Sequence, residues 1–201
     1  MVPELGNKDV DRRGNFVTKF LARLFFRLSG WRITGEIPDC QKFVAIVAPH
    51  TSNWDWFLGM MLMYGVGIKF SFLIKKSVFI PGFGGILRFL GGIPINRSAA
   101  NSVVGDAVRA FESHDRLILV ITPEGSRKSN GSLKTGFYRI ATKANVPILL
   151  VGIDYPNKRL DAGTFLDISQ PEEKNFRVIH EYFETMEGRY SGFLGSPKKS
   201  K

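Results

Sequence analysis

Short apolar stretches recur along the chain and predict buried strands. They span residues 43–48, 69–75, 93–95, 117–121 and 148–153, with 164–168 as a further candidate. Runs with little polar alternation are typical of strands buried on both faces of a parallel sheet. Pro94 in the third run has no backbone N–H to donate to a neighbouring strand. That strand is therefore expected at a sheet edge or a bulge.

Helical periodicity separates these runs. It covers residues 16–31, 54–65, 86–90, 101–113, 136–145 and 171–190. Alternating strands and helices predict an α/β fold, in which one domain holds a mixed, mostly parallel sheet flanked by helices. We expect four segments: a flexible lead (1–15), an amphipathic helix (16–30), the α/β domain (31–190) and a basic tail (191–201).

The first predicted helix carries a pattern of its own. An apolar row and a cationic row each repeat every four residues: Phe16, Phe20, Leu24 and Leu28, and Lys19, Arg23 and Arg27. No acidic residue occurs from Phe16 to Gly35. Such a helix suits the surface of an anionic membrane. The alternative is an ordinary amphipathic helix that packs on the protein's own core.

Composition narrows the classes of partner. The 201 residues have a net charge of +10 and a pI near 9.9, which favours nucleic acid, an anionic bilayer or phosphorylated substrates. Cys40 is the only cysteine, so an intrachain disulfide and a cysteine metal cluster are excluded. The chain has only three histidines, which argues against a histidine-rich metal site. The longest apolar run, 57–68, is shorter than the ~20 residues of a membrane span. We therefore expect no transmembrane span.

Two polar motifs follow buried strands directly, 74 residues apart. The first runs from His50 to Asp55. On a regular helix these two side chains would point about 140° apart, so they meet only if His50 precedes the helix and Asp55 lies in its first turn. Ser52 is one of three good N-caps between them. A carboxylate on one ring nitrogen leaves the other as a general base, although such a pair alone is more often structural.

The second motif is Glu124-Gly125-Ser126-Arg127. Gly125 permits a tight turn with positive φ, and Arg127 offers a planar fork to phosphate oxygens. Ser126 adds a hydroxyl, and Glu124 can orient Arg127 or hold an acceptor hydroxyl. The alternative is a solvated turn with a surface ion pair.

A third cluster, 91–97, ends in Arg97 beyond another predicted strand. Arg97 and Arg127 together would clamp a phosphate from two sides, although surface solubility explains Arg97 alone. The nucleophile elbow Gly-x-Ser-x-Gly does not occur. The simplest scheme is direct attack of an alcohol on a thioester, without an acyl-enzyme.

With these blocks in order, the chain resembles the glycerolipid acyltransferase family typified by 1-acylglycerol-3-phosphate acyltransferase. That family carries His-x4-Asp, a glycine-rich block ending in Arg, Glu-Gly-Thr-Arg and Val-Pro-Ile. The corresponding blocks here are His50/Asp55, 91–97, 124–127 and 146–148, within residues 31–155. Two departures are Asn96, where Asp commonly precedes the Arg, and Ser126 in place of Thr.

The resemblance implies transfer of a fatty acyl group from acyl-CoA or acyl-carrier protein to a lysophospholipid acceptor, in particular 1-acylglycerol-3-phosphate, giving phosphatidic acid. His50 would be the base and Asp55 its orienting partner. The implied acceptor and pocket residues are Arg97, Glu124, Gly125, Ser126, Arg127 and Pro147. No metal or cofactor is implied, and the expected location is the cytoplasmic side of a membrane, peripheral or monotopic.

Three alternatives stay open. The same chemistry can acylate another lipid or a glycolipid. The same His-Asp pair can activate water, which would make the protein a hydrolase that needs no acceptor. A basic nucleic-acid-binding domain would suit the charge, but the sequence shows none of the usual recognition motifs.

Overall fold

The computed structural model describes residues 10–37, 39–96, 100–124 and 133–190, without the side chains of 100–102. Seven strands form one sheet: β1 (Arg32–Gly35), β2 (Lys42–Ala48), β3 (Ser71–Lys75), β4 (Gly92–Ile95), β5 (Leu117–Ile121), β6 (Ile148–Asp154) and β7 (Arg159–Leu166). Their order across the sheet is β1-β7-β6-β2-β5-β3-β4. Every neighbouring pair is parallel except β6 and β7. The predicted α/β class and mostly parallel sheet are confirmed.

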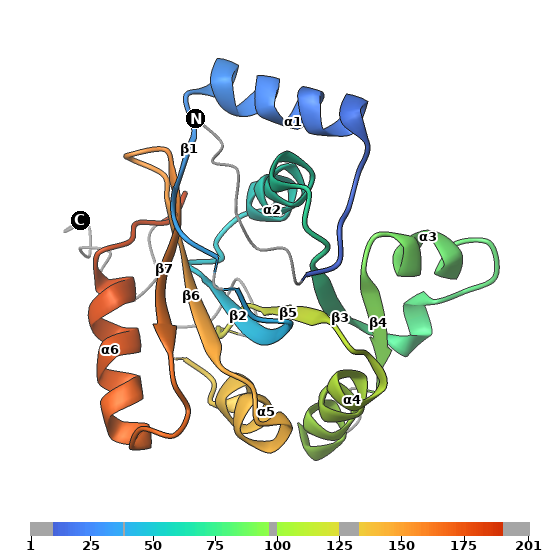
Figure 1. The fold of residues 1–201 in the computed structure, drawn as a ribbon, viewed down its shortest axis with the longest axis vertical. Coiled ribbons are helices and arrows are strands. Elements are labelled where there is room, and N and C mark those ends of the chain that lie inside the picture. The colour runs from blue at the N-terminus through green and yellow to red at the C-terminus, as the bar shows by residue number, and fades with distance from the viewer. Residues whose placement is uncertain (1–9, 38, 97–99, 125–132, 191–201) are drawn as a thin grey trace.

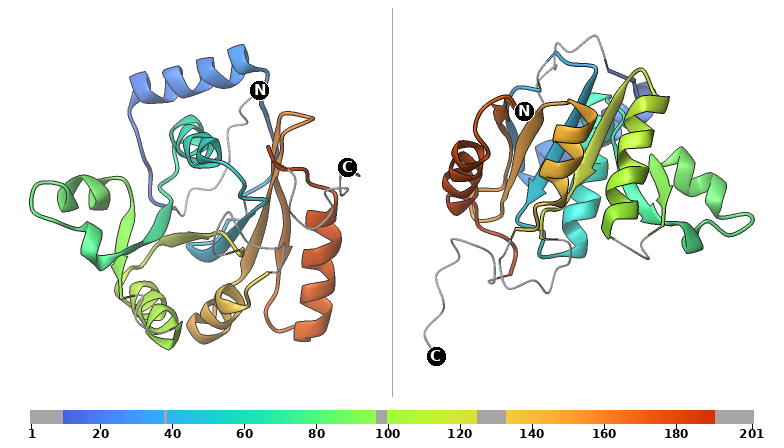
Figure 2. Two further views of the ribbon diagram at one scale, coloured as in Figure 1. Left: turned by 180° about the vertical axis from the view of Figure 1, so that it is seen from behind. Right: turned by 90° about the horizontal axis from the view of Figure 1, so that it is seen from below.

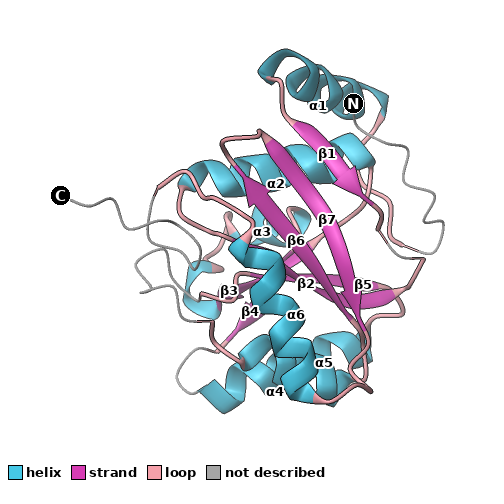
Figure 3. Cartoon of the chain, turned by 90° about the vertical axis from the view of Figure 1, so that its left-hand side faces the viewer, coloured by secondary structure: helices cyan, strands magenta, loops and turns pink. Residues whose placement is uncertain are grey.

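Helices cover both faces of this sheet (Figure 1, Figure 2 and Figure 3). The helices are α1 (Phe16–Ser29), α2 (Asn53–Val66), the 3-10 turn η1 (Lys76–Val78), α3 (Gly84–Phe89), α4 (Ala100–Ser113), α5 (Gly136–Ala144) and α6 (Glu172–Glu184). Helices α1 and α2 lie over one face, and α4, α5 and α6 lie over the other. β4 is an edge strand, as Pro94 predicts.

Strand β2 is central, and its side chains alternate between two apolar cores. Val44, Ile46 and Ala48 pack with α4, α5 and α6. Phe43 and Ala45 face α2 and the chain near α1. Burial on both faces explains why this strand reads as a continuous apolar run. The packed strands provide a rigid support for the loops at their ends.

Two strands and one helix differ from the predicted elements. β7 begins at Arg159, five residues before the candidate run at 164–168, and its first half is mostly half-buried, so it forms no apolar run. β1 was not expected, because four residues with one buried side chain carry little pattern. Helix α6 ends at Glu184 instead of near residue 190, with Met186 turned into the core.

The structure describes residues 10–15 of the expected flexible lead, attached to the fold; residues 1–9 lie outside the described part of the chain. Val10 is only 1% exposed. Arg12 pairs with Ile68 in an isolated bridge, and Lys69 N–H donates to Asp11 O at 2.8 Å. The segment is polar in sequence yet ordered, because its backbone hydrogen bonds and one buried side chain attach it to the end of α2.

Helix α1 turns its apolar face away from the protein. Only Ala22 and Phe26 are buried, and the exposed set is Phe16, Val17, Phe20, Leu21, Leu24 and Leu28. Arg23 of the cationic row instead faces inward, and its Nε donates to Gly65 O at 3.3 Å. A cation is favourable there because Gly65 lies in the last turn of α2, at the negative end of the helix dipole. Packing on α2 therefore leaves the apolar row uncovered.

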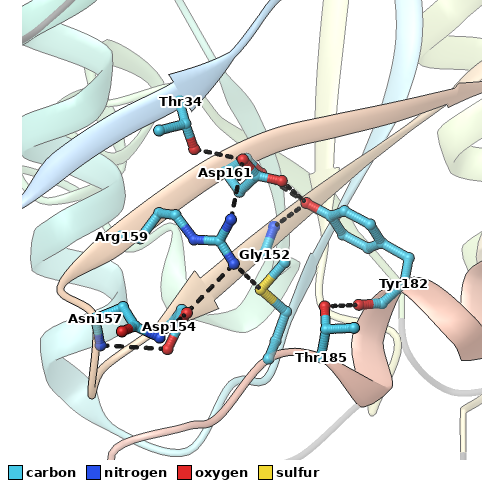
Figure 4. A network of polar contacts seen from close by, with 9 residues as sticks. Thr34, Gly152, Asp154, Asn157, Arg159, Asp161, Tyr182 and Thr185 are labelled. Carbon is cyan, nitrogen blue, oxygen red and sulfur yellow. Dashed lines mark hydrogen bonds and ion pairs between the residues drawn. The ribbon is translucent and has the colours of Figure 1, made fainter.

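A polar network braces the β6–β7 hairpin against α6 (Figure 4). The Tyr182 hydroxyl accepts from Gly152 N–H at 3.1 Å and donates to Asp161 at 2.9 Å. Arg159 donates to Asp154 at 3.3 Å, and Thr34 bonds Asp161 from β1. These bonds join three strands and one helix, and they fix the turn that follows β6.

Candidate active site

The predicted His50–Asp55 geometry is present. Strand β2 ends at Ala48, and α2 begins at Asn53 with Ser52 as its N-cap. His50 therefore stands outside the helix while Asp55 occupies its first turn. The His50 Nδ1 atom lies 3.2 Å from Asp55 Oδ2.

The Asp55 carboxylate is buried and receives several hydrogen bonds. Its side chain is 1% exposed. Oδ2 accepts from the backbone N–H groups of Thr51 at 2.8 Å and Ser52 at 2.7 Å, and Oδ1 accepts from the Tyr155 hydroxyl at 2.6 Å. Burial pushes the pKa of Asp55 up, but hydrogen bonds from His50, Tyr155 and Ser52 outweigh it and hold the pKa below its ordinary value. Asp55 is thus an ionised acceptor.

This arrangement fixes the tautomer of His50. An ionised carboxylate only accepts hydrogen bonds, so Nδ1 must carry the proton that points at Asp55. The Nε2 atom is then left with its lone pair. The imidazole side chain is 22% exposed and borders a pocket, so Nε2 can accept a proton from a bound molecule.

Glu124 reaches the same loop from β5, through a backbone contact. It is 3% exposed, and its Oε1 and Oε2 atoms accept from His50 N–H at 2.8 and 3.0 Å. Burial raises the pKa of Glu124, against the His50 N–H bond that stabilises its ionised form. In the described structure Glu124 therefore holds the backbone that carries the His50 side chain.

Tyr155 completes the site and was not predicted from the sequence. It follows β6 by one residue, its hydroxyl bonds Asp55, and its ring packs edge-on against Trp31 at 5.0 Å. Burial and the Asp55 carboxylate raise the pKa of Tyr155 above its ordinary value, so it stays a protonated donor. The signal that marks His50, a polar residue just past a buried strand, also marks Tyr155.

Three neighbouring strands thus supply the site. β5, β2 and β6 are adjacent and parallel, so their carboxyl ends share one edge of the sheet. Glu124, His50 and Tyr155 follow these three ends. Ligand sites of open α/β sheets form at this edge.

A pocket of ≈ 550 Å³ opens beside His50. Apolar side chains dominate its wall, among them Trp56, Met60, Phe72, Leu73, Ile95 and Val103. A narrower apolar cavity of ≈ 70 Å³ lies between α2 and the sheet. Val47, Asp55, Gly59, Phe70 and Val120 border both spaces. A polar pair therefore stands at the head of apolar space that reaches into the fold.

The remaining predicted residues have two different outcomes. Arg97, Gly125, Ser126 and Arg127 lie outside the described residues. The structure does not bring Pro147 to His50. Pro147 precedes β6, and its carbonyl accepts from Val44 N–H near the start of β2, so it lies at the opposite edge of the sheet. Among the described residues, no three His, Cys, Asp or Glu side chains gather as metal ligands would.

A family model described as "Acyltransferase" matches residues 32–154. The chain is 31% identical over 155 residues to a 1-acyl-sn-glycerol-3-phosphate acyltransferase of Streptococcus pneumoniae, covering 71% of this chain and 57% of the relative. Proteins of that name from the chloroplasts of Brassica napus and Arabidopsis thaliana are 28% and 33% identical, over 57% and 52% of this chain and 35% and 32% of theirs. The chain thus spans less than two thirds of each relative.

The fold also matches a solved structure. The 1-acyl-sn-glycerophosphate acyltransferase PlsC of Thermotoga maritima aligns with a TM-score of 0.56 at 20% identity, covering 83% of this chain and 75% of that one. At that identity the match establishes a shared fold. Residue roles depend on the geometry described above.

Proposed function

Because this chain belongs to the Acyltransferase family, we propose that it transfers a fatty acyl group from an acyl thioester to a hydroxyl of a lysophospholipid-type acceptor, 1-acylglycerol-3-phosphate foremost. One observation carries the proposal. A buried, ionised Asp55 orients His50 at the mouth of a largely apolar pocket. A general base beside apolar space is what acyl transfer between lipids requires.

The proposed reaction is a direct displacement. His50 Nε2 takes the proton of the acceptor hydroxyl while the hydroxyl oxygen attacks the thioester carbonyl carbon. A C–O bond forms, and the tetrahedral intermediate then expels the thiolate as the C–S bond breaks. The thiolate leaves with the proton held on His50, so the base is regenerated. Asp55 stabilises the imidazolium in between.

The apolar spaces offer room for acyl chains. The pocket and the narrower cavity meet along Asp55 and Gly59 of α2. A thioester carbonyl placed near His50 would direct its chain along this wall. The proposed donors are acyl-CoA and acyl-carrier protein, and burial of each methylene contributes about 0.8 kcal/mol.

The acceptor phosphate would be bound by the sequence motifs beyond β4 and β5. Arg97 and Arg127 follow strands that end at the same edge of the sheet as β2. Their guanidinium groups suit phosphate oxygens. Arg127→Ala is expected to raise KM for a phosphorylated acceptor, with a smaller effect on kcat.

We further propose that α1 binds an anionic membrane surface. Its exposed apolar row has no covering partner among the described residues, and Phe16 is 84% exposed. No described helix is both long and apolar enough to cross a bilayer. A helix that lies in the interface with its apolar face down fits this exposure. It would bring the pocket close to lipid acceptors.

Thiol release from an acyl thioester, with and without lysophospholipid, tests the function. His50→Ala is expected to lose on the order of 10² to 10⁴-fold in kcat, the usual range for a general base. Thermal unfolding of the variant provides the folding control. Equal rates in wild type and variant would reject His50 as the base.

The same assay separates transfer from hydrolysis. A transferase releases thiol at a rate that depends on the acceptor and forms an ester product. Release of free fatty acid at the same rate without acceptor would instead establish a hydrolase that uses the same His-Asp pair.

A further inference from the structure

The connection between β3 and β4 exposes five large apolar side chains within twelve residues. They are Val78, Ile80, Phe83, Ile86 and Phe89, which we call the 78–89 patch, and each is 41% to 66% exposed. Isolated exposed apolar residues are ordinary, but such a concentration marks an interaction surface. The patch is separate from the apolar face of α1 and from the pocket beside His50.

The backbone beneath the patch is ordered. Gly84 N–H donates to Ile80 O at 2.8 Å, and Leu87 N–H donates to Phe83 O at 3.1 Å. Buried Gly84 packs against Phe79, where an added Cβ would meet the Phe79 backbone at 3.4 Å. Backbone groups of this segment therefore bond to one another, while its apolar side chains project into solvent. A segment that enters an apolar medium needs this arrangement, because unbonded backbone groups are costly there.

The charge around the patch points to an anionic surface. No Asp or Glu occurs from residue 56 to residue 105, a stretch that contains five Lys and Arg. Lys75, Lys76 and Arg88 are exposed on the segment itself. Cations held near an anionic leaflet are attracted to it. Apolar side chains flanked by cations match the interface of an anionic bilayer.

The patch contacts the segment that leads into α1. The Arg13 guanidinium lies 4.0 Å from the centroid of the Phe89 ring, and α1 begins three residues after Arg13. In Figure 1, α3 stands on the side of the molecule where the chain rises into α1. This contact ties the patch to the chain segment that carries α1.

We propose that the 78–89 patch is a second membrane-docking surface that inserts into the interfacial layer of an anionic bilayer. With α1 alone, the molecule could pivot about one helix. With the patch, two contacts fix the orientation of the fold. β3 and β4 flank the patch and also wall the pocket through Phe72, Leu73 and Ile95, so docking orients the His50 pocket toward the lipid. The orientation of the pocket toward lipid is useful only if the proposed lipid acceptor is correct. The docking itself does not depend on that acceptor.

The test measures binding of the full chain to vesicles of phosphatidylcholine with phosphatidylglycerol. Phe83→Asp/Ile86→Asp is expected to weaken binding on the order of 100-fold, because two apolar side chains that would be buried in the interface are replaced by charges. Thr142→Asp/Gln170→Asp is the matched control. It adds the same two negative charges at exposed positions near α5 and α6, and it should bind within a few-fold of wild type. Equal binding by the patch variant and the control would overturn the proposal.

A second measurement does not depend on the Asp variants folding. Phe83→Cys, placed in a Cys40→Ser background, is labelled with an environment-sensitive dye. Its emission should shift to the blue on addition of the same vesicles, while dye at Thr142→Cys should not respond. No shift at position 83 would overturn the proposal even if α1 binds.

Two further outcomes are distinguishable. Light scattering that shows a dimer lost in Phe83→Asp/Ile86→Asp, with vesicle binding unchanged, would reassign the patch to a contact between copies and overturn the proposal. Acyl transfer is measured separately with short-chain, monomeric substrates in solution. Vesicle binding that depends on the patch, in a protein without acyl transfer, would support docking while the proposed function fails.

Discussion

At the scale of single residues, the site is organised around one carboxylate. Asp55 accepts from two backbone N–H groups, one imidazole and one phenol. The backbone donors come from the loop that also carries His50, so carboxylate and base move together. Tyr155 is the only one of these donors from another strand. It fixes the carboxylate relative to the sheet, and we regard it as a positioning residue.

Tyr155→Phe is therefore expected to lower kcat about tenfold. A hydrogen bond to a charged group contributes roughly 1.5–3 kcal/mol, and 1.4 kcal/mol corresponds to a factor of ten. KM for both substrates should stay near the wild-type value, because the phenol bonds Asp55 and Tyr155 is not among the residues that line the pocket. Steady-state kinetics with soluble substrates measure both values. A change in KM alone would contradict the positioning role.

The pH dependence of stability separates positioning from packing. Because the folded-state pKa of Asp55 is depressed, its ionised form contributes stability above the unfolded value of about 3.9. That contribution is lost as pH falls through the lower folded pKa. Without the phenol the folded pKa rises, so Tyr155→Phe should lose this stability at a higher pH than wild type. Urea unfolding at several acidic pH values would show parallel profiles if Tyr155 merely fills space.

Sequence reasoning could predict His50 with Asp55 but not Tyr155 with Asp55. The first pair is local, because helix geometry and a good N-cap suffice to place five consecutive residues. The second pair is 100 residues apart and depends on β6 lying beside β2. Periodicity does not reveal strand order. For the same reason, the sequence suggested substrate contacts for Glu124, whereas the structure gives it a bond to the His50 backbone.

At the scale of elements, the two capping boxes give a matched comparison. Ser52 caps α2 and Asn15 caps α1, each with a reciprocal side-chain partner. Ser52→Ala and Asn15→Ala should each cost about 1 kcal/mol in the free energy of unfolding. Only Ser52→Ala should also lower activity on soluble substrates, since the first turn of α2 carries Asp55. Urea titration and kinetics test this, and equal activity losses would mean that the cap does not position the carboxylate.

Helix α1 leads to an element-scale prediction about membrane binding. Phe20→Asp/Leu24→Asp changes two side chains of the exposed apolar row. It should release the protein from vesicles that contain phosphatidylglycerol while the unfolding temperature stays near the wild-type value. The contact of Arg23, from the cationic row, with Gly65 is untouched. Co-sedimentation is the measurement, and unchanged binding would mean that α1 is a structural element only.

Elements with strong patterns could be predicted, and weakly patterned ones could not. The central strands β2, β5 and β6 are buried on both faces and appear as unbroken apolar runs. β1 is an edge strand of the sheet and β7 lies next to it. Mixed burial in β1 and in the first half of β7 weakens the hydrophobic pattern there. The periodicity of α1 was visible, but which of its faces turns inward was not. That choice depends on the carbonyl end of α2, a tertiary feature.

At the scale of the whole molecule, both cavities depend on a gap between α2 and the sheet. Gly59 lies where the pocket meets the cavity, and a Cβ added there would meet nothing within 4 Å. A glycine inside a helix costs about 0.5–1 kcal/mol relative to alanine. The sequence therefore accepts a less stable helix at a position that borders both the pocket and the cavity.

Gly59→Leu should consequently separate stability from function. Leucine favours the helical conformation more than glycine does. The protein should therefore unfold at an equal or higher temperature. The leucine would occupy acyl-chain space, and kcat/KM for long-chain thioesters should fall about tenfold or more, with less effect on short chains. Gly136→Leu is the control, because Gly136 is also open to a Cβ but lies in α5 on the other face. An equal loss of kcat/KM at all chain lengths would place the acyl chain elsewhere. A loss of kcat/KM that grows with chain length would assign this gap to the acyl chain of the donor or acceptor.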